Sequence, residues 1–176
     1  MVDVVRLHTS ELDADTRAAA RELLYAVFDD MTEHDWEHSL GGLHALVMDG
    51  ARVVGHAAIV QRRLLYGGRA LRAGYVEGVA VHPEHRRRGY CGAMMAVVEG
   101  VARRAYDVAA LGATDEAAAM YVSRGWQLWQ GPSWALTPSG IRRTEDDDGA
   151  VHVLPLGVEL DVRESLTCDW RDGDVW

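Results

Sequence analysis

The segment Val76–Met95, "VEGVAVHPEHRRRGYCGAMM", is decisive for the fold because it passes from a strand through a basic loop into a helix. The apolar run that ends at Val81 is typical of a strand, and a helical pattern begins near Tyr90. Between them, Pro83 marks a loop and Gly89 lets a ligand approach the backbone closely. The free amides of a helix start attract anions, and arginines add charge-assisted hydrogen bonds to phosphate oxygens. The segment therefore predicts a site for a small anionic ligand, rather than three arginines that only solvate a loop.

The elements around this segment alternate in type. In chain order we expect a strand, two helices, three strand-like runs, a helix, a strand and a helix, at residues 3–9, 11–28, 32–40, 43–81, 92–106, 107–113 and 115–125. Thr9 or Ser10 is the expected cap of the first helix. Asp49-Gly50 and Gly67-Gly68 are hairpin signals, and residues 139–150 are expected to form an exposed polar loop. This order predicts an α/β (α+β) fold with a mixed, mostly antiparallel central sheet flanked by helices.

Composition excludes several classes of protein. The chain has 176 residues, of which 48% are hydrophobic, so we expect a single domain over residues 1–176. Its net charge of -9 disfavours nucleic acids and favours cationic partners. No stretch approaches the roughly 18 apolar residues of a membrane span, and the N-terminus lacks a signal-peptide pattern. The two cysteines, Cys91 and Cys168, form no metal-binding spacing, so we expect a soluble, cytoplasmic protein.

Two motifs resemble those of the GNAT acetyltransferase superfamily. The stretch "RRRGYC", Arg86–Cys91, resembles its R-x-x-G-x-G/A pyrophosphate motif, with cysteine in a position usually held by glycine or alanine. The stretch "AAAMYVSRGW", Ala117–Trp126, resembles its helix with a tyrosine four residues before a Gly-aromatic pair. Four further stretches, "DWEHSLGGLHAL", "GYVEGVAV", "EDDDGAVHVLP" and "CDWRDGDVW", resemble the mycobacterial aminoglycoside 2'-N-acetyltransferases. This second resemblance spans essentially the whole chain.

The resemblance implies a GNAT fold and acetyl-CoA as co-substrate. The backbone of the strand before the loop is then expected to bind the pantetheine arm and the acetyl carbonyl, while the loop and helix start bind the pyrophosphate. The expected cofactor-binding residues are Val79, Ala80, Val81, Arg86, Arg87, Arg88, Gly89, Tyr90, Cys91 and Gly92.

The acceptor implied by the resemblance is an aminoglycoside, which carries several ammonium groups. A pocket for a polycation should be lined by carboxylates, and this sequence offers many, although most single carboxylates only solvate a surface. Asp35 is one candidate from the acidic residues. The substrate contacts implied by similarity are Asp30, Glu77, Gly78, Asp147, Asp174 and Trp176. Gly112 stands where some relatives have serine, so any hydroxyl contact at that position is lost or replaced by water.

Direct acetyl transfer needs a base for the ammonium group and an acid for the departing thiolate. Glu77 is the candidate base, acting directly or through water, and the alternative is a carboxylate bonded to backbone. Tyr121 is the candidate acid, and the alternative is a core tyrosine. Trp176 is counted with the catalytic and the substrate residues: its indole is expected to anchor the tail and its α-carboxylate to face the acceptor. The alternative is a tail that only packs on the domain.

We predict no metal. The stretch "HDWEH" places His34 and His38 on one helix face, as in some zinc sites, but no third ligand stands out. The acidic run "EDDDG" lacks the alternating spacing of a calcium loop. The family resemblance implies a homodimer. Two alternatives stay open: acetylation of another small cationic amine or a peptide, and binding of acyl-CoA or a cationic drug without turnover.

Overall fold

The computed structural model describes residues 3–176 and divides them into two compact units. The first unit comprises residues up to Val60 together with Val76–Val101, and the second comprises Gln61–Tyr75 and Ala102–Trp176. The long strands β3 (Arg52–Tyr66) and β4 (Arg69–Val81) each contribute residues to both units. Each unit is therefore described by itself.

The first unit consists of strands with helices on both faces. Besides its parts of β3 and β4, it contains β1 (Val4–His8), α1 (Ala14–Val27), α2 (Glu33–His38), β2 (Leu43–Asp49), α3 (Tyr90–Ala105, up to Val101) and short 3-10 turns at Thr9–Glu11 and Pro83–His85. β1 pairs antiparallel with β2, and β2 pairs antiparallel with β3. No helix within residues 3–176 is long and apolar enough to span a bilayer.

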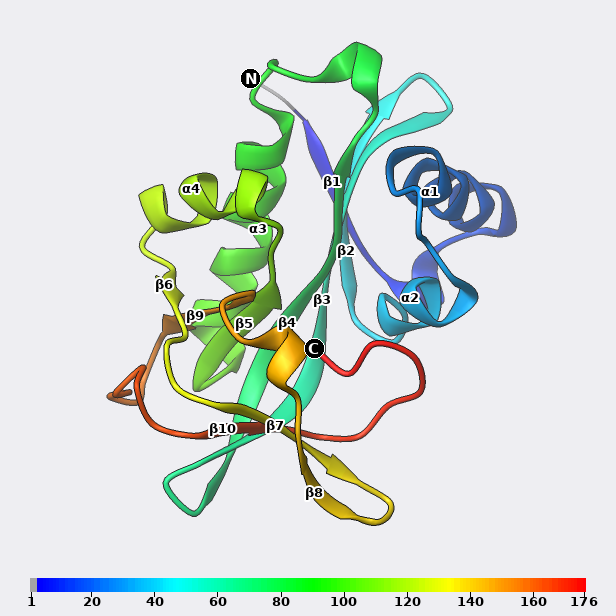
Figure 1. Ribbon diagram of the computed structural model, residues 1–176. Coiled ribbons are helices and arrows are strands. Elements are labelled where there is room, and N and C mark those ends of the chain that lie inside the picture. The colour runs from blue at the N-terminus through cyan, green and yellow to red at the C-terminus, as the bar shows by residue number, and fades with distance from the viewer. Residues whose placement is uncertain (1–2) are drawn as a thin grey trace. The chain divides into compact units, whose positions relative to one another are not determined.

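Alternation along β3 explains why helices cover both faces. A Cβ at Gly55 would come within 3.1 Å of Met94 in α3. The next residue, His56, lies instead beside Trp36 of α2, with ring centroids 6.2 Å apart. Successive strand residues point to opposite faces, so α2 and α3 cover opposite sides of this strand. Figure 1 shows α1 and α2 together beside β2 and β3, where Leu24 and Leu46 join the same buried cluster.

The second unit is built mainly from short strands. Its elements are β5 (Val108–Gly112), α4 (Asp115–Ser123), β6 (Gln127–Leu128), β7 (Ser133–Thr137), β8 (Gly140–Arg143), a 3-10 turn at Glu145–Asp147, β9 (Val151–Pro155) and β10 (Leu166–Cys168). With its parts of β3 and β4, the strand order is β6-β9-β5-β4-β3-β10-β7-β8. The β4–β5 and β10–β7 pairs are parallel, and the β5–β9 and β7–β8 pairs are antiparallel.

These elements confirm the predicted fold class, a mixed and mostly antiparallel sheet flanked by helices. Both hairpin turns form where expected, between β2 and β3 and between β3 and β4. The expected cap of the first helix was wrong: Asp13 caps α1, because the chain first makes the 3-10 turn at Thr9–Glu11. The expected loop at 139–150 was also wrong in part, since it contains β8, which pairs with β7. The single domain over residues 1–176 stays a prediction.

Candidate functional site

The loop between β4 and α3 has the backbone geometry of an anion site. Arg87 and Gly89 both adopt left-handed conformations, with φ angles of 62° and 81°. Backbone turns of this kind direct successive N–H groups into one concavity. The amide of Ala93 bonds to the carbonyl of Gly89, so the residues between them form the first turn of α3. Amides of a first turn have no partner within their own helix and are available to an anion.

A pocket of about 400 Å³ lies along this loop within the first unit. Its lining includes most of the predicted cofactor residues: Val79, Ala80, Val81, Arg86, Arg87, Gly89, Tyr90 and Cys91, with Val27, Phe28 and His85 in addition. Among the described residues, Arg88 and Gly92 lie outside this lining. Arg86 Nε donates to the carbonyl of Val81 at 3.3 Å, which ties the loop to the end of β4. The arrangement fits an elongated ligand with an apolar arm and an anionic part.

Glu77 and Gly78 precede this pocket on β4. Gly78 has a φ of 56°, a conformation that side chains rarely adopt, in the middle of a strand. A Cβ there would come within 3.0 Å of Leu24 and 3.2 Å of His56. The carbonyl of Gly78 accepts a hydrogen bond from His56 Nδ1 at 2.7 Å. Glycine is therefore required at this position by both conformation and packing.

The two remaining predicted acceptor residues of the first unit differ in their surroundings. Asp30 is exposed in the turn that follows α1. Asp35 completes the capping box of α2, whose N-cap is Thr32: the Oδ2 of Asp35 accepts from the amide and from the hydroxyl of Thr32, each at 2.7 Å. This capping role was missed, although Thr32 three residues before Asp35 resembles the capping-box spacing. The predicted substrate contacts of Asp30 and Asp35 stay predictions.

In the second unit, Trp176 is held by hydrogen bonds to Thr144, Asp174 and Arg171. Its indole Nε1 donates to Thr144 Oγ1 at 2.9 Å, and its side chain is buried. Its amide donates to Asp174 Oδ1 at 3.1 Å, and its main-chain oxygen accepts from Arg171 Nη2 at 3.0 Å. Gly112 lies beside it, where a Cβ would sit 3.8 Å from the Trp176 carbonyl carbon, an ordinary contact. A serine would therefore fit at position 112.

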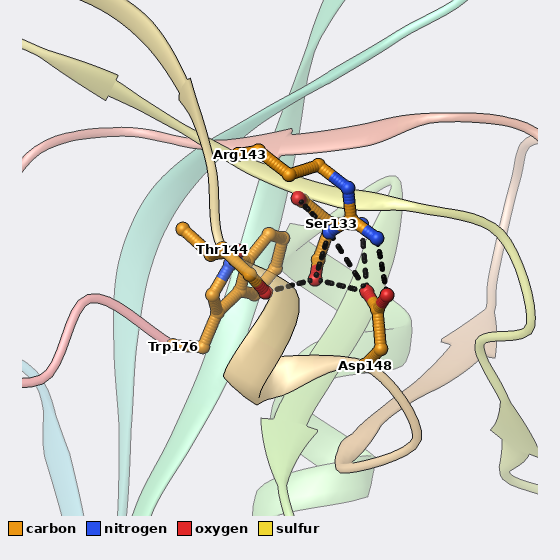
Figure 2. Close-up of polar contacts among 5 residues, drawn as sticks. All are labelled: Ser133, Arg143, Thr144, Asp148 and Trp176. Carbon is orange, nitrogen blue, oxygen red and sulfur yellow. Dashed lines mark hydrogen bonds and ion pairs between the residues drawn. The ribbon is translucent and has the colours of Figure 1, made fainter.

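The partner of the Trp176 indole is fixed by a polar network (Figure 2). Asp148 forms an ion pair with Arg143 and accepts from the hydroxyl of Ser133 at 2.7 Å. The carbonyl of Thr144 lies 2.9 Å from the same hydroxyl and competes with Asp148 for its single proton. Hydrogen bonds from Arg143 and Ser133 keep the pKa of Asp148 well below its usual value. This network connects β7 and β8 to the turn that carries Thr144. It thereby fixes the residue that binds the Trp176 indole.

The charged form of Asp147, which lies in that turn, is disfavoured by its surroundings. Partial burial, followed by the negative charge of Asp174, raises its pKa above the usual value. A carboxylate whose charged form is disfavoured in the free protein gains most when a cation arrives. Asp147 and Asp174 together thus form an acidic feature next to Trp176, as expected for a cationic acceptor.

Tyr121 is buried on α4 in the second unit. Its ring packs edge-on against Trp126, with centroids 6.0 Å apart, and lies 6.3 Å from the ring of His152. The packing of Tyr121 against Trp126 explains the tyrosine and Gly-aromatic spacing noted in the sequence. Its role as an acid stays a prediction.

The structure groups the predicted residues within each unit. The cofactor residues, Glu77 and Gly78 belong to the first, and Gly112, Tyr121, Asp147, Asp174 and Trp176 belong to the second. Among residues 3–176, one group of at least three potential ligands has its ligand atoms within 4.8 Å of one another: His82, Glu84 and His85. Within that range, His34 and His38 belong to no such group. The prediction that the protein uses no metal stays a prediction.

A larger hollow of about 960 Å³ in the second unit is lined by Tyr66, Gln130, Pro155 and residues 159–163. None of the predicted site residues within 3–176 is part of this lining.

Two arginines of the second unit were missed by the sequence analysis. The guanidinium carbons of Arg62 and Arg171 lie 4.7 and 5.3 Å from the centroid of the Tyr75 ring. Arg171 also donates from Nε to the carbonyl of Asp174 at 2.7 Å. Arg171 lies within the acidic stretch "DWRDGD", where nothing in the sequence indicates a partner, and only the fold brings it to the Tyr75 ring.

Comparisons with known proteins agree with this geometry. A family model described as an acetyltransferase (GNAT) domain matches residues 8–129. The aminoglycoside 2'-N-acetyltransferase of Mycolicibacterium fortuitum is 51% identical over 97% of this chain and 90% of its own length.

Solved structures support the fold. The GNAT family N-acetyltransferase YhbS from Escherichia coli in complex with CoA has a TM-score of 0.64 at 15% identity, with 98% of this chain and 92% of that one covered. Eis1 from Mycobacterium abscessus has a TM-score of 0.61 at 20% identity over 76% of this chain, which spans only 33% of Eis1.

Proposed function

Because this chain belongs to the GNAT acetyltransferase family, we propose that it transfers the acetyl group of acetyl-CoA to the 2'-amino group of aminoglycosides. The observation that carries the acceptor is the 51% identity to an aminoglycoside 2'-N-acetyltransferase along 97% of the chain. The acidic pair next to Trp176 supports a polycationic acceptor independently of that similarity.

The first unit supplies the residues for acetyl-CoA. The left-handed loop and the start of α3 offer amides to the pyrophosphate, and the three arginines at 86–88 add positive charge. The strand residues Val79, Ala80 and Val81 line the same pocket and offer backbone groups to the pantetheine arm and to the acetyl carbonyl. Acetyl-CoA supplies the activated acetyl group.

For the acceptor we propose the predicted contacts of both units: Asp30, Asp35, Glu77, Gly78, Gly112, Asp147, Asp174 and Trp176. Asp147 and Asp174 attract the ammonium groups, and Trp176 anchors the tail through its buried indole. At Gly112, water takes the place of the hydroxyl that a serine would offer.

Each chemical role falls to a residue of this chain. Glu77 removes a proton from the acceptor ammonium, directly or through water, which leaves a neutral amine able to attack the acetyl carbonyl. Backbone amides of the Val79–Val81 strand polarise that carbonyl. Tyr121 donates a proton to the departing thiolate of coenzyme A, and the second proton lost by the acceptor nitrogen passes through solvent and restores the Tyr121 hydroxyl. The transfer is direct, so no side chain carries the acetyl group.

Acetylation offers a physical basis for antibiotic resistance. Converting an ammonium into an amide removes one positive charge from the drug, which weakens its attraction to an anionic target. We further propose that the protein acts in the cytoplasm as a homodimer, as the family resemblance implies. Sedimentation of the purified protein tests the dimer.

An amine panel tests the acceptor class. The purified protein is incubated with acetyl-CoA and, separately, with aminoglycosides, polyamines and a short lysine peptide, and coenzyme A release is followed by thiol titration. We expect rapid release with aminoglycosides and slow release with the others. Faster coenzyme A release with a polyamine or a peptide would show that the acceptor is not an aminoglycoside. Binding of acetyl-CoA without coenzyme A release in the presence of any amine would indicate a non-catalytic protein.

A further inference from the structure

Two fully buried histidines of the first unit have no part in the mechanism above. His44 lies on β2 and His56 on β3, and both are fully buried. The register pairs Leu46 with His56, so His44 is a diagonal neighbour of His56 on the same face. Their ring centroids are 5.2 Å apart, and Trp36 lies against both rings. Buried polar rings of this kind need complete hydrogen bonding.

The hydrogen bonds of this pair run in one direction. A carbonyl oxygen only accepts, so His56 Nδ1 carries a proton and donates to the Gly78 carbonyl at 2.7 Å. In the neutral ring, His56 Nε2 then accepts from His44 Nδ1 at 3.0 Å. His44 Nε2 accepts in turn from Thr9 Oγ1 at 2.8 Å, and Thr9 Oγ1 accepts from the Gly41 amide at 2.8 Å. Every nitrogen of both rings has a partner.

Both rings are neutral, which keeps this direction fixed. Burial lowers the pKa of His56 to about 4, and burial together with the neighbouring His56 lowers the pKa of His44 to about 3. At neutral pH each ring therefore carries one proton, and the carbonyl of Gly78 constrains where that proton lies on His56.

This series of hydrogen bonds ends at the peptide bond between Gly78 and Val79. The described residues contain no cis peptide bond, so the Gly78 carbonyl and the Val79 N–H point in opposite directions from one rigid plane. The carbonyl faces His56, and the Val79 N–H therefore points away from it. A hydrogen bond accepted by the carbonyl also makes the N–H of the same peptide a stronger donor. Val79 lines the pocket proposed for acetyl-CoA.

We propose that His56, oriented by His44 and Thr9, is a positioning residue that fixes the Gly78–Val79 peptide so that the Val79 N–H binds the acetyl carbonyl of acetyl-CoA. The left-handed Gly78 departs from regular strand geometry, and a side-chain donor, His56 Nδ1, holds its carbonyl. The inference rests on the acetyl-CoA half of the proposed function.

Three variants isolate this role. His56→Leu removes the donor to the carbonyl. His56→Asn keeps an amide nitrogen near the position of Nδ1 and should restore the bond. Ser39→Ala is the control, because Ser39 is equally buried close to Gly78, and its hydroxyl has no hydrogen-bond partner among residues 3–176.

The decisive readout is the affinity for acetyl-CoA compared with coenzyme A, measured by calorimetry without any acceptor. Coenzyme A lacks the acetyl carbonyl and should bind wild type and all variants equally. We expect His56→Leu to weaken acetyl-CoA binding by about tenfold, the value of one hydrogen bond. The kcat should fall by about ten- to a hundredfold, because the N–H group that donates to the acetyl carbonyl is displaced. His56→Asn and Ser39→Ala should stay close to wild type.

A purely structural role gives a different pattern. Equal losses for acetyl-CoA and coenzyme A, or an Asn variant as impaired as the Leu variant, would overturn the inference while leaving the proposed function intact. If His56→Leu does not fold, His44→Leu replaces it: His56 remains but loses its orienting donor, and an unchanged affinity ratio overturns the inference. Failure of the wild type to bind acetyl-CoA would overturn the proposed function and the inference with it.

Discussion

Replacing Gly78 by alanine tests whether the strand conformation beside the proposed base is required. The new Cβ would lie 3.0 Å from Leu24 Cδ1, 3.1 Å from Ser39 Oγ and 3.2 Å from His56 Cε1, and all three side chains are buried. A left-handed alanine costs about 1–2 kcal/mol. Overpacking against neighbours that cannot move costs about 1–3 kcal/mol more. We therefore expect the free energy of unfolding to fall by about 2–5 kcal/mol.

Gly50→Ala is the matched control. Gly50 has a φ of 61°, close to that of Gly78, and apart from its chain neighbours no atom of residues 3–176 would lie within 4 Å of its Cβ. It pays the conformational cost alone, so the difference between the two variants isolates packing at about 1–3 kcal/mol. Urea unfolding of both variants measures this difference. Equal destabilisation would refute the packing argument at Gly78.

Four further outcomes follow from the second unit. Tyr121→Phe should lower kcat by roughly ten- to a thousandfold and leave the affinity for acetyl-CoA unchanged, and wild-type turnover in the folded variant would make Tyr121 structural. Thr144→Val leaves the buried indole N–H of Trp176 without its acceptor, so stability should fall by about 1–3 kcal/mol and KM for the aminoglycoside should rise. Asp147→Asn should raise the midpoint of thermal unfolding, because the raised pKa of Asp147 means that its charge is disfavoured in the free protein, yet it should also raise KM for the aminoglycoside. A lower midpoint in that variant would contradict the electrostatic argument. The pKa of Asp148 is lowered by folding, so its contribution to stability is complete above about pH 4, its unfolded value, and is lost as the pH falls through the folded value. Asp148→Asn should remove this part of the acid dependence, as unfolding curves at several pH values can show.

Local turn chemistry explains why much of the fold could be predicted from the sequence. Asp49-Gly50 and Gly67-Gly68 mark hairpins that depend only on backbone conformation, and both form. The basic loop with Gly89 likewise carries its geometry within a few residues, and it lines the pocket that was expected there.

Contacts between distant residues account for what was missed. The cap of α1 moved to Asp13 because His8 and Glu11 cap a separate 3-10 turn first. The polar stretch that contains β8 was predicted as a loop, because the contacts of Arg143 with Ser133 and Asp148 form only in the folded protein.

The histidine chain was missed for the same reason. His44 and His56 look like unrelated strand residues until the register of β2 and β3 brings their rings together. No local pattern contains that register.

Regiochemistry tests the central claim most directly. Two matched aminoglycosides, identical except that one carries a 2'-amino group and the other a 2'-hydroxyl, are incubated with the protein and acetyl-CoA, and the products are analysed by mass spectrometry with fragmentation. The account predicts a single acetyl group on the 2'-nitrogen of the first drug and no acetylation of the second, which should still bind. Equal acetylation of both drugs, or an acetyl group on another nitrogen of the first, would contradict it.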